Sequence, residues 1–258
     1  MTTNTINWTE RDVQCAAAVL GKASEGGFAL PTLTDEEVVA LDGVQREQIV
    51  ALPWLTAQDA SKDVMCAVAL RGLLAKELVY PVIFEGETEP SRLHAVEDIT
   101  GALTLRRSGS TVVSVERTVS TGRRWLYAYV HAEGVLLEEV DDGGLHGYTV
   151  IARGALAARL ADFVDPEGTA ARDTEAATYT EAEFEASAPT VLGDTRAASN
   201  VVAFDSDAGD FPTVTVYTGT ESVHVLTPST QGDTVSLELR ETSRETLTGI
   251  LGRLAGLS

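Results

Sequence analysis

Alternating apolar and polar positions predict an antiparallel sheet between residues 111 and 151. The first run, Thr111–Val119, is β-branched almost throughout, and residues 125–130 alternate aromatic with aliphatic side chains, which is the period of a strand. Two acidic residues and two glycines at 141–144 give a strong hairpin signal. We therefore expect four strands in a meander, followed by a helix over 153–163 that packs on one face.

Helical spacing dominates the first eighty residues. Thr9 precedes one apolar-periodic segment as its N-cap, and Thr34 to Glu37 forms a capping box before a second. Trp54 follows a helix-breaking proline and is expected in the core. A third helix is predicted over about 57–78. The side chains expected to attach it to the core share helical spacing: Val64, Val68, Leu74 and Leu78.

Short strands are predicted on either side of a short helix in the next part of the chain. The strands are expected over 80–84 and 103–107, and the helix over 93–103.

The second part of the chain repeats this plan. Residues 165–200 are rich in Ala, Thr, Glu and Asp, and the capping box at Thr180 to Glu183 predicts a helical insert. Strand patterns then return at four places, 201–204, 213–217, 222–226 and 234–239. An amphipathic helix over 243–257, with Leu251 on its apolar stripe, closes the chain.

These patterns predict a single α+β domain over residues 1–258. Its antiparallel β-sheet is expected to consist of two quasi-two-fold related halves, about 1–164 and 201–258, with N-terminal, inserted (165–200) and C-terminal helices. The relation between the halves is architectural, because their residues are hardly ever identical.

The charge balance narrows the possible partners. The formal net charge of −20 disfavours nucleic acid and anionic membranes, whereas basic or apolar protein surfaces remain possible partners. No apolar run approaches the roughly 18–20 residues that span a bilayer, so no membrane insertion is expected. The N-terminus lacks the pattern of a signal peptide, so we expect a cytoplasmic protein. Cys15 and Cys66 lie among alanines and valines and are expected to be buried, free thiols in a reducing compartment.

Motifs that carry chemistry are absent from the sequence. It has no dinucleotide fingerprint, P-loop, HExxH or GxSxG motif, and its four histidines, His94, His131, His146 and His224, are scattered. We therefore expect no catalytic residue, no cofactor and no metal ion. Carboxylates are so abundant that sequence cannot select an acid–base pair among them.

The predicted strand at residues 125–130 has an unusual set of side chains on one side. Trp125, Tyr127 and Tyr129 alternate on it, directly after Arg123 and Arg124. Either the protein's own helices and loops cover these rings, or they form an exposed aromatic–arginine patch, which is the composition of an interface hot spot. These five residues are the candidate partner-binding site.

The order of these features resembles the EspG family, the actinobacterial chaperones of type VII (ESX) secretion. The matching elements are a helical segment that ends at 69–75, the strands of 103–117, the helical insert around 182–187 and the second strand set with its closing helix. The resemblance implies an α+β fold with a quasi-two-fold. It also implies a non-enzymatic chaperone that binds PE–PPE secretion substrates in the cytoplasm.

The alternative is an enzyme or a small-ligand-binding protein with its site at the junction of the two halves. A deep pocket with convergent polar groups would favour it.

Overall fold

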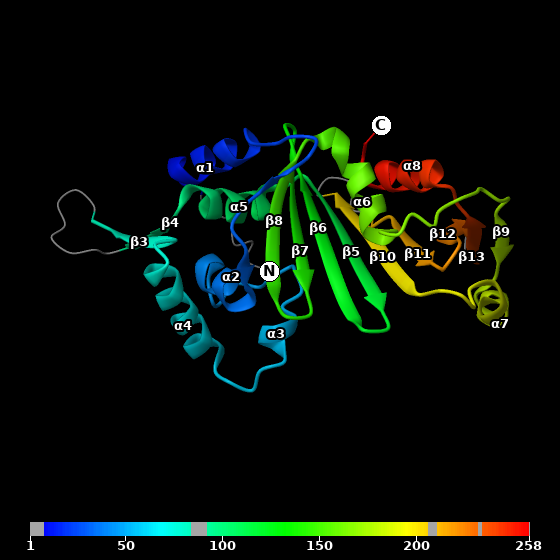
Figure 1. Ribbon diagram of the computed structural model, residues 1–258, viewed down its shortest axis with the longest axis horizontal. Coiled ribbons are helices and arrows are strands. Elements are labelled where there is room, and N and C mark those ends of the chain that lie inside the picture. Colours follow the sequence, from blue (N-terminus) through cyan, green and yellow to red (C-terminus); the bar gives the residue numbers. More distant parts are fainter. Residues whose placement is uncertain (1–7, 84–91, 206–210, 232–233, 258) are drawn as a thin grey trace. The chain divides into compact units, whose positions relative to one another are not determined.

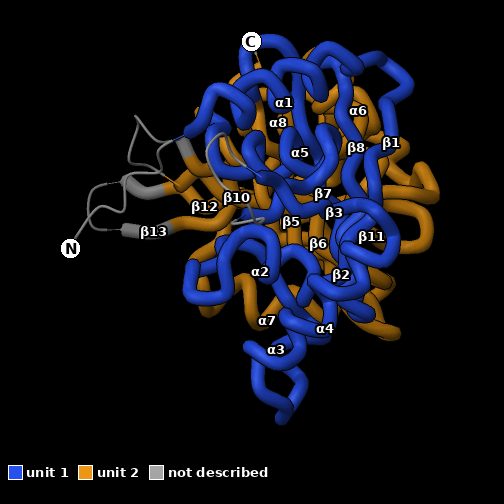
Figure 2. Tube along the Cα trace, turned by 90° about the vertical axis from the view of Figure 1, so that its left-hand side faces the viewer, with its two compact units in different colours: residues 1–109, 131–152 blue, residues 110–130, 153–258 orange. Residues whose placement is uncertain are grey.

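The computed structural model describes residues 8–83, 92–205, 211–231 and 234–257. They form two compact units, neither of which is continuous in sequence. Unit 1 comprises residues within 1–109 and 131–152, and unit 2 comprises residues within 110–130 and 153–258 (Figure 2).

Unit 1 combines helices with a short antiparallel sheet (Figure 1). Its helices are α1 (Glu10–Leu20), α2 (Asp35–Asp42), α3 (Pro53–Thr56), α4 (Lys62–Ala75) and α5 (Glu97–Ser108). Its strands are β1 (Phe28–Ala29), β2 (Leu33–Thr34), β3 (Val79–Val82), β4 (Arg92–Ala95), β7 (Val135–Asp141) and β8 (Leu145–Ile151). Strand β8 pairs with β7, β1 and β2, while β3 pairs with β4 in a separate ribbon.

Two helix pairs build the α-helical part of unit 1. Helix α1 packs against α5, and α2 packs against α4. Gly101 of α5 lies so close to α1 that a Cβ there would come within 2.5 Å of the Cys15 carbonyl oxygen, so this approach requires glycine.

Unit 2 is dominated by antiparallel strands in the order β6-β5-β10-β11-β12-β13-β9. The strands are β5 (Thr111–Val119), β6 (Gly122–Val130), β9 (Ala177–Tyr179), β10 (Ala197–Asp205), β11 (Thr213–Thr218), β12 (Val223–Gln231) and β13 (Thr234–Glu241). The helices are the 3-10 turn η1 (Arg153–Ala155), α6 (Leu156–Val164), α7 (Glu181–Val191) and α8 (Arg244–Leu254). Helices α6 and α8 pack against each other, and Leu251 is completely buried.

The predicted fold class, an antiparallel α+β protein with N-terminal, inserted and C-terminal helices, is confirmed. The meander over residues 111–151 forms β5 to β8, and the four later strand patterns form β10 to β13. Capping boxes begin α1, α2 and α7, where a threonine and an acidic residue three positions later satisfy free backbone N–H groups. The single domain over 1–258 and the quasi-two-fold relation between its halves stay predictions.

The strand predicted over 103–107 is wrong, because these residues belong to α5. Five residues of alternating pattern fit a strand, but the longer window from Glu97 to Ser108 places Ile99, Ala102 and Leu105 at helical spacing. All three are buried, so burial follows the helical period and overrides the short alternation.

The predicted core face of α4 is also wrong. Val64 and Val68 are both 62% exposed, and the helix is instead held by Cys66 and Leu73, which are 2% and 0% exposed. Trp54, expected in the core, is 37% exposed.

The two cysteines are free and buried, as predicted. Burial raises the pKa of both thiols, so they stay protonated and behave as small apolar side chains. Every helix in the described ranges is too short or too polar to cross a membrane.

Candidate functional site

Unit 1 contains a buried chain of charged side chains. His146 Nε2 lies 2.8 Å from Asp35 Oδ1, and His146 Nδ1 lies 2.7 Å from Glu138 Oε1. The other carboxylate oxygen of Glu138 accepts a 2.8 Å hydrogen bond from Arg106 Nε. Arg106 Nη1 in turn lies 3.7 Å from Asp42 Oδ2. These five residues, which we call the ionic network, are at most 9% exposed.

Strand register places two members of this network, Glu138 and His146, on one face of the β7–β8 hairpin. Glu138 pairs with Tyr148 and Val140 pairs with His146, so Glu138, His146 and Tyr148 point to the same side. Asp35 is the first residue of α2 and lies under the hairpin turn, where its backbone N–H donates to the Gly144 carbonyl at 2.9 Å. Gly144 has a φ of 72°, and a Cβ there would come within 2.8 Å of the Asp35 carboxylate, so glycine is required.

The electrostatics of the network favour a charged His146. Burial alone would lower the pKa of His146, but its hydrogen bonds to Asp35 and Glu138 outweigh that penalty and raise the pKa above its usual value. In the protonated form both ring nitrogens donate, and the imidazolium is held between the Asp35 and Glu138 carboxylates. Burial and the charge of Glu138 raise the pKa of Tyr148 well above its usual value, so its hydroxyl donates to Glu138 Oε1 at 2.9 Å.

Asp42 connects the network to a surface pocket. Burial would raise the pKa of Asp42, but its hydrogen bonds and ion pairs, chiefly with Arg107, lower it overall. Arg46 Nη1 lies 3.1 Å from Asp42 Oδ1, and Arg107 Nε lies 3.1 Å from Asp42 Oδ2. The carboxylate therefore holds two arginines at the pocket wall and contacts a third, Arg106, in the interior.

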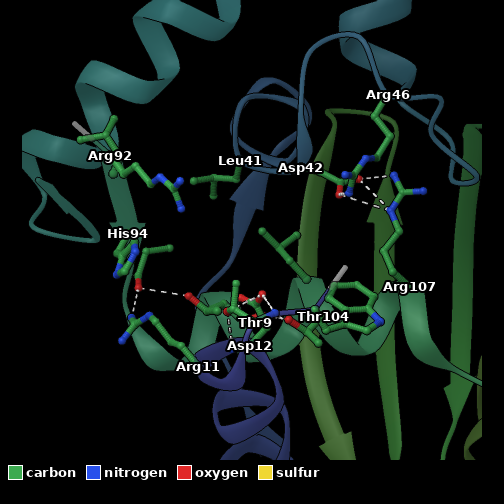
Figure 3. Close-up of a pocket in the computed structure, with 15 residues that line it drawn as sticks. Thr9, Arg11, Asp12, Leu41, Asp42, Arg46, Arg92, His94, Thr104 and Arg107 are labelled. Carbon is green, nitrogen blue, oxygen red and sulfur yellow. Dashed lines mark hydrogen bonds and ion pairs between the residues drawn. The ribbon is translucent and has the colours of Figure 1, made fainter. Parts of the chain in front are cut away.

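The pocket lies within unit 1 and has a volume of about 540 Å³. Its lining includes five basic side chains and two carboxylates: Arg11, Arg46, Arg92, His94, Arg107, Asp12 and Asp42. Figure 3 shows Arg92 directed toward Leu41, while Arg107 and Arg46 converge on Asp42. This is a basic cavity in an acidic chain, and its size suits a small anionic ligand.

The ionic network is not arranged for catalysis. An Asp–His–Glu set could serve acid–base chemistry, but both imidazole nitrogens of His146 are occupied by carboxylates and its side chain is 0% exposed. A substrate cannot reach it. Within the described residues, no group of three or more His, Cys, Asp or Glu side chains is placed to hold a metal ion.

The predicted site residues on β6 are divided between surface and interior. Arg123 and Arg124 are exposed, whereas Trp125 and Tyr127 are 6% and 7% exposed and Tyr129 is completely buried. The three aromatic rings are therefore covered by other parts of the protein and do not form an exposed patch. The role of the five residues in partner binding stays a prediction.

Contacts with β5 fix the first residues of β6. The Trp125 indole N–H donates to Glu116 Oε2 at 3.1 Å. The Arg123 guanidinium lies 5.6 Å from the centre of the Trp125 ring and 3.6 Å from Glu116 Oε1. The structure thus brings Arg123 and Trp125 together around Glu116, a residue that the sequence did not single out.

Sequence reasoning missed the ionic network because its five members come from four separate elements spread along the chain: α2, α5, β7 and β8. One signal was present: Glu138 interrupts the apolar run of β7, and His146 stands across the hairpin turn on the same face. A carboxylate within a buried strand requires a partner, and an opposite histidine is the nearest candidate.

Comparison with known proteins gives a likeness in structure and none in sequence. No protein family matches the chain by sequence, and no curated protein matches it. Among solved structures, the chain is similar to the Mycobacterium tuberculosis type VII secretion system chaperone EspG5, determined in complex with a PE25–PPE41 dimer. The TM-score is 0.53 at 8% identity, and the match covers 87% of this chain and 95% of the chaperone chain. At this identity the likeness shows an EspG-like fold and leaves function to be proposed.

Proposed function

We propose that this chain is a non-enzymatic, cytoplasmic protein-binding protein that acts as a chaperone for a type VII secretion substrate. The observation that carries the proposal is the extent of the structural likeness to EspG5, which spans nearly the whole of both chains. A likeness that covers 95% of the chaperone chain extends over nearly the whole fold and is not limited to a common core.

The finer proposal concerns the partner. EspG5 was determined in complex with a PE25–PPE41 dimer, so a PE–PPE-like pair is the first candidate for this chain. The net charge of −20 supports a protein partner with apolar or basic surface and opposes nucleic acid.

Co-expression tests this function directly. The full chain, carrying an affinity tag, is expressed with each PE–PPE-like pair encoded by the source genome, and the eluate is analysed by size-exclusion chromatography with light scattering. We expect one pair to co-elute with the chain at the mass of a complex with one copy of each protein. The same pair expressed without the chain serves as the control. Failure of every pair to bind would contradict the finer proposal.

The small-ligand alternative has one specific observation behind it, the basic pocket of unit 1. Inorganic phosphate and succinate can be titrated by calorimetry against the wild type and Arg11→Ala, because Arg11 lines this pocket. Saturable binding that the substitution abolishes would favour a ligand-binding protein. Heats equal to those of dilution would remove this alternative at the pocket.

A further inference from the structure

The outward face of α4 is apolar, which is unusual for a surface helix. Val64 and Val68 are each 62% exposed, and Leu74 is 36% exposed. The exposed residues on this face share the spacing of one helix side: Val64, Ala67, Val68, Arg71, Leu74 and Ala75. We call this set the α4 face. A surface helix normally presents polar residues to solvent, so the α4 face reverses the expected pattern.

Folding does not account for the α4 face. The opposite side of the helix already attaches it to unit 1, because Cys66 packs with Val39 and Leu55 in a buried cluster and Leu73 is completely buried. The protein therefore keeps an apolar surface at α4 that its own core does not use. Exposed apolar side chains gathered on one side of a helix favour a site of interaction.

Arg71 stands in the middle of the α4 face. It comes one helical turn after Val68 and one turn before Leu74, and it is exposed. No carboxylate in the described part of the chain pairs with Arg71, whereas Lys76 at the end of the same helix lies 3.1 Å from Glu37 Oε1. An arginine within apolar surface is a common interface anchor, and covering it requires a compensating negative charge.

We propose that the α4 face docks an amphipathic α-helix of a partner protein whose apolar stripe carries a carboxylate opposite Arg71. Spacing of i, i+3, i+4 and i+7 is the ridge pattern that packs against another helix. A bidentate carboxylate would satisfy the guanidinium that docking removes from water. This inference deepens the proposed function and rests on it in one respect, that the occupant is a protein.

A second copy of this chain is the wrong occupant on electrostatic grounds. Each copy carries a net charge of −20, so two copies repel each other. A two-fold contact between two α4 faces centred on Arg71 would also bring the two guanidinium groups together. A different protein with a carboxylate at this position avoids both costs.

Selection of helical peptides on the full-length protein tests the proposal. The displayed peptides share a fixed apolar stripe with i, i+3, i+4 and i+7 spacing, and one position in the middle of the stripe is randomised. We expect Asp or Glu at this position on the wild type, and Lys or Arg on Arg71→Glu. Val68→Asp should weaken the selected acidic peptide by about 30-fold, the scale of an interface hot spot.

Matched variants outside the α4 face separate the loss of docking from the effect of a changed surface charge. Val13→Asp changes a valine of α1 that is 56% exposed, and Arg253→Glu changes an exposed arginine of α8. Neither should alter peptide affinity, and all four variants should unfold at the temperature of the wild type because each residue is exposed.

Several results would overturn docking at α4. In one, the selection enriches no helical peptide; in another, the enriched peptides bind Val68→Asp as tightly as they bind the wild type. In a third, light scattering reveals a dimer that Val68→Asp dissociates, which would make the occupant a second copy of this chain. A PE–PPE-like complex that forms equally well with Val68→Asp would also overturn it and leave the proposed function intact. Conversely, if the selection succeeds and no PE–PPE-like pair binds, the proposed substrate is wrong and docking at α4 stands.

Discussion

The interiors of the two units are built differently. Unit 1 buries the ionic network, whose Asp35, Glu138 and His146 are all 0% exposed. In unit 2, α6 and α8 pack through aliphatic side chains that are likewise completely buried: Leu156, Leu160, Leu247 and Leu251. Side chains that are equally buried therefore form two kinds of interior. One depends on the pairing of charges, and the other depends on aliphatic side chains that fill the space between the helices.

This difference predicts which substitutions destabilise each unit most. Loss of a methyl group in an aliphatic interior costs free energy in proportion to the cavity, whereas loss of one member of a buried ion pair leaves its partner charged without compensation. The stability of unit 1 should therefore be sensitive to pH and to the loss of a single charged side chain. The stability of unit 2 should be sensitive to the replacement of its buried apolar side chains.

The largest effect is expected for Leu251→Asp in unit 2. It places a carboxylate in the apolar contact between α8 and α6 and should destabilise the protein by more than about 4 kcal/mol, so that the protein unfolds or aggregates. Circular dichroism during heating measures this. Arg253→Asp, on the exposed side of the same helix, is the control. An unchanged melting temperature for Leu251→Asp would show that α8 is not packed in solution.

The next effect is expected for Glu138→Ala in unit 1. Removal of this carboxylate leaves Arg106 and His146 without their shared partner and should cost about 3–5 kcal/mol of unfolding free energy. Urea titration gives the value. Glu139→Ala, at the neighbouring and more exposed position, should cost much less. Equal losses for the two variants would mean that the network contributes nothing specific to unit 1.

Trp125→Ala tests whether β6 belongs to the interior of unit 2 or to an interface. Because the ring is 6% exposed and donates to Glu116, we expect a loss of about 3 kcal/mol of unfolding free energy, with affinity for the partner intact in the folded fraction. Arg123→Ala removes an exposed ion pair with Glu116 and a contact with the Trp125 ring, and it should cost about 1 kcal/mol. Unchanged stability with weakened partner binding for Trp125→Ala would instead assign β6 to the interface.

The smallest effects are pH-dependent and have opposite signs for two histidines of unit 1. The pKa of His146 is raised above 6.5, so its contribution to stability is fully present below pH 6.5 and is lost as the pH rises through its folded-state pKa. Burial lowers the pKa of His131, despite its hydrogen bond to the Leu105 carbonyl, so its contribution is present above pH 6.5 and is lost as the pH falls.

Nuclear magnetic resonance of the imidazole nitrogens follows both titrations, and each pKa unit corresponds to about 1.4 kcal/mol. Two histidines that titrate together near pH 6.5 would contradict the difference between their environments.

Local patterns were sufficient for much of the fold. The meander, the N-cap at Thr9 and the capping boxes at Thr34 and Thr180 were predicted because each depends on residues close together in the sequence. Helix α5 was misjudged where a five-residue alternation competed with a longer helical period. The period alone did not show which side of α4 is buried, since Val64 and Val68 fit a core stripe as well as Cys66 and Leu73 do.

The candidate sites depended on non-local pairing, which sequence does not show. His146 was singled out only as one of four scattered histidines, and its partners Asp35 and Glu138 were two acidic residues among 39. Only the β7–β8 register and the position of α2 bring the three together. Trp125 was singled out from its place on an aromatic strand, but its burial depends on what packs around β6.

The discontinuity of both units determines the order in which a growing chain can complete them. Asp35 and Arg106 are synthesised before Glu138 and His146, so the interior of unit 1 cannot be neutralised until β7 and β8 have emerged from the ribosome. The β5–β6 hairpin is made between these two events, and the strand that pairs with β5, β10, follows only much later. During this interval β5 presents an open edge of unpaired backbone groups, which is a template for pairing with other chains. A fragment that ends between β8 and β10 contains all of unit 1 but keeps that edge permanently and is therefore expected to aggregate, whereas the full-length chain closes it with β10.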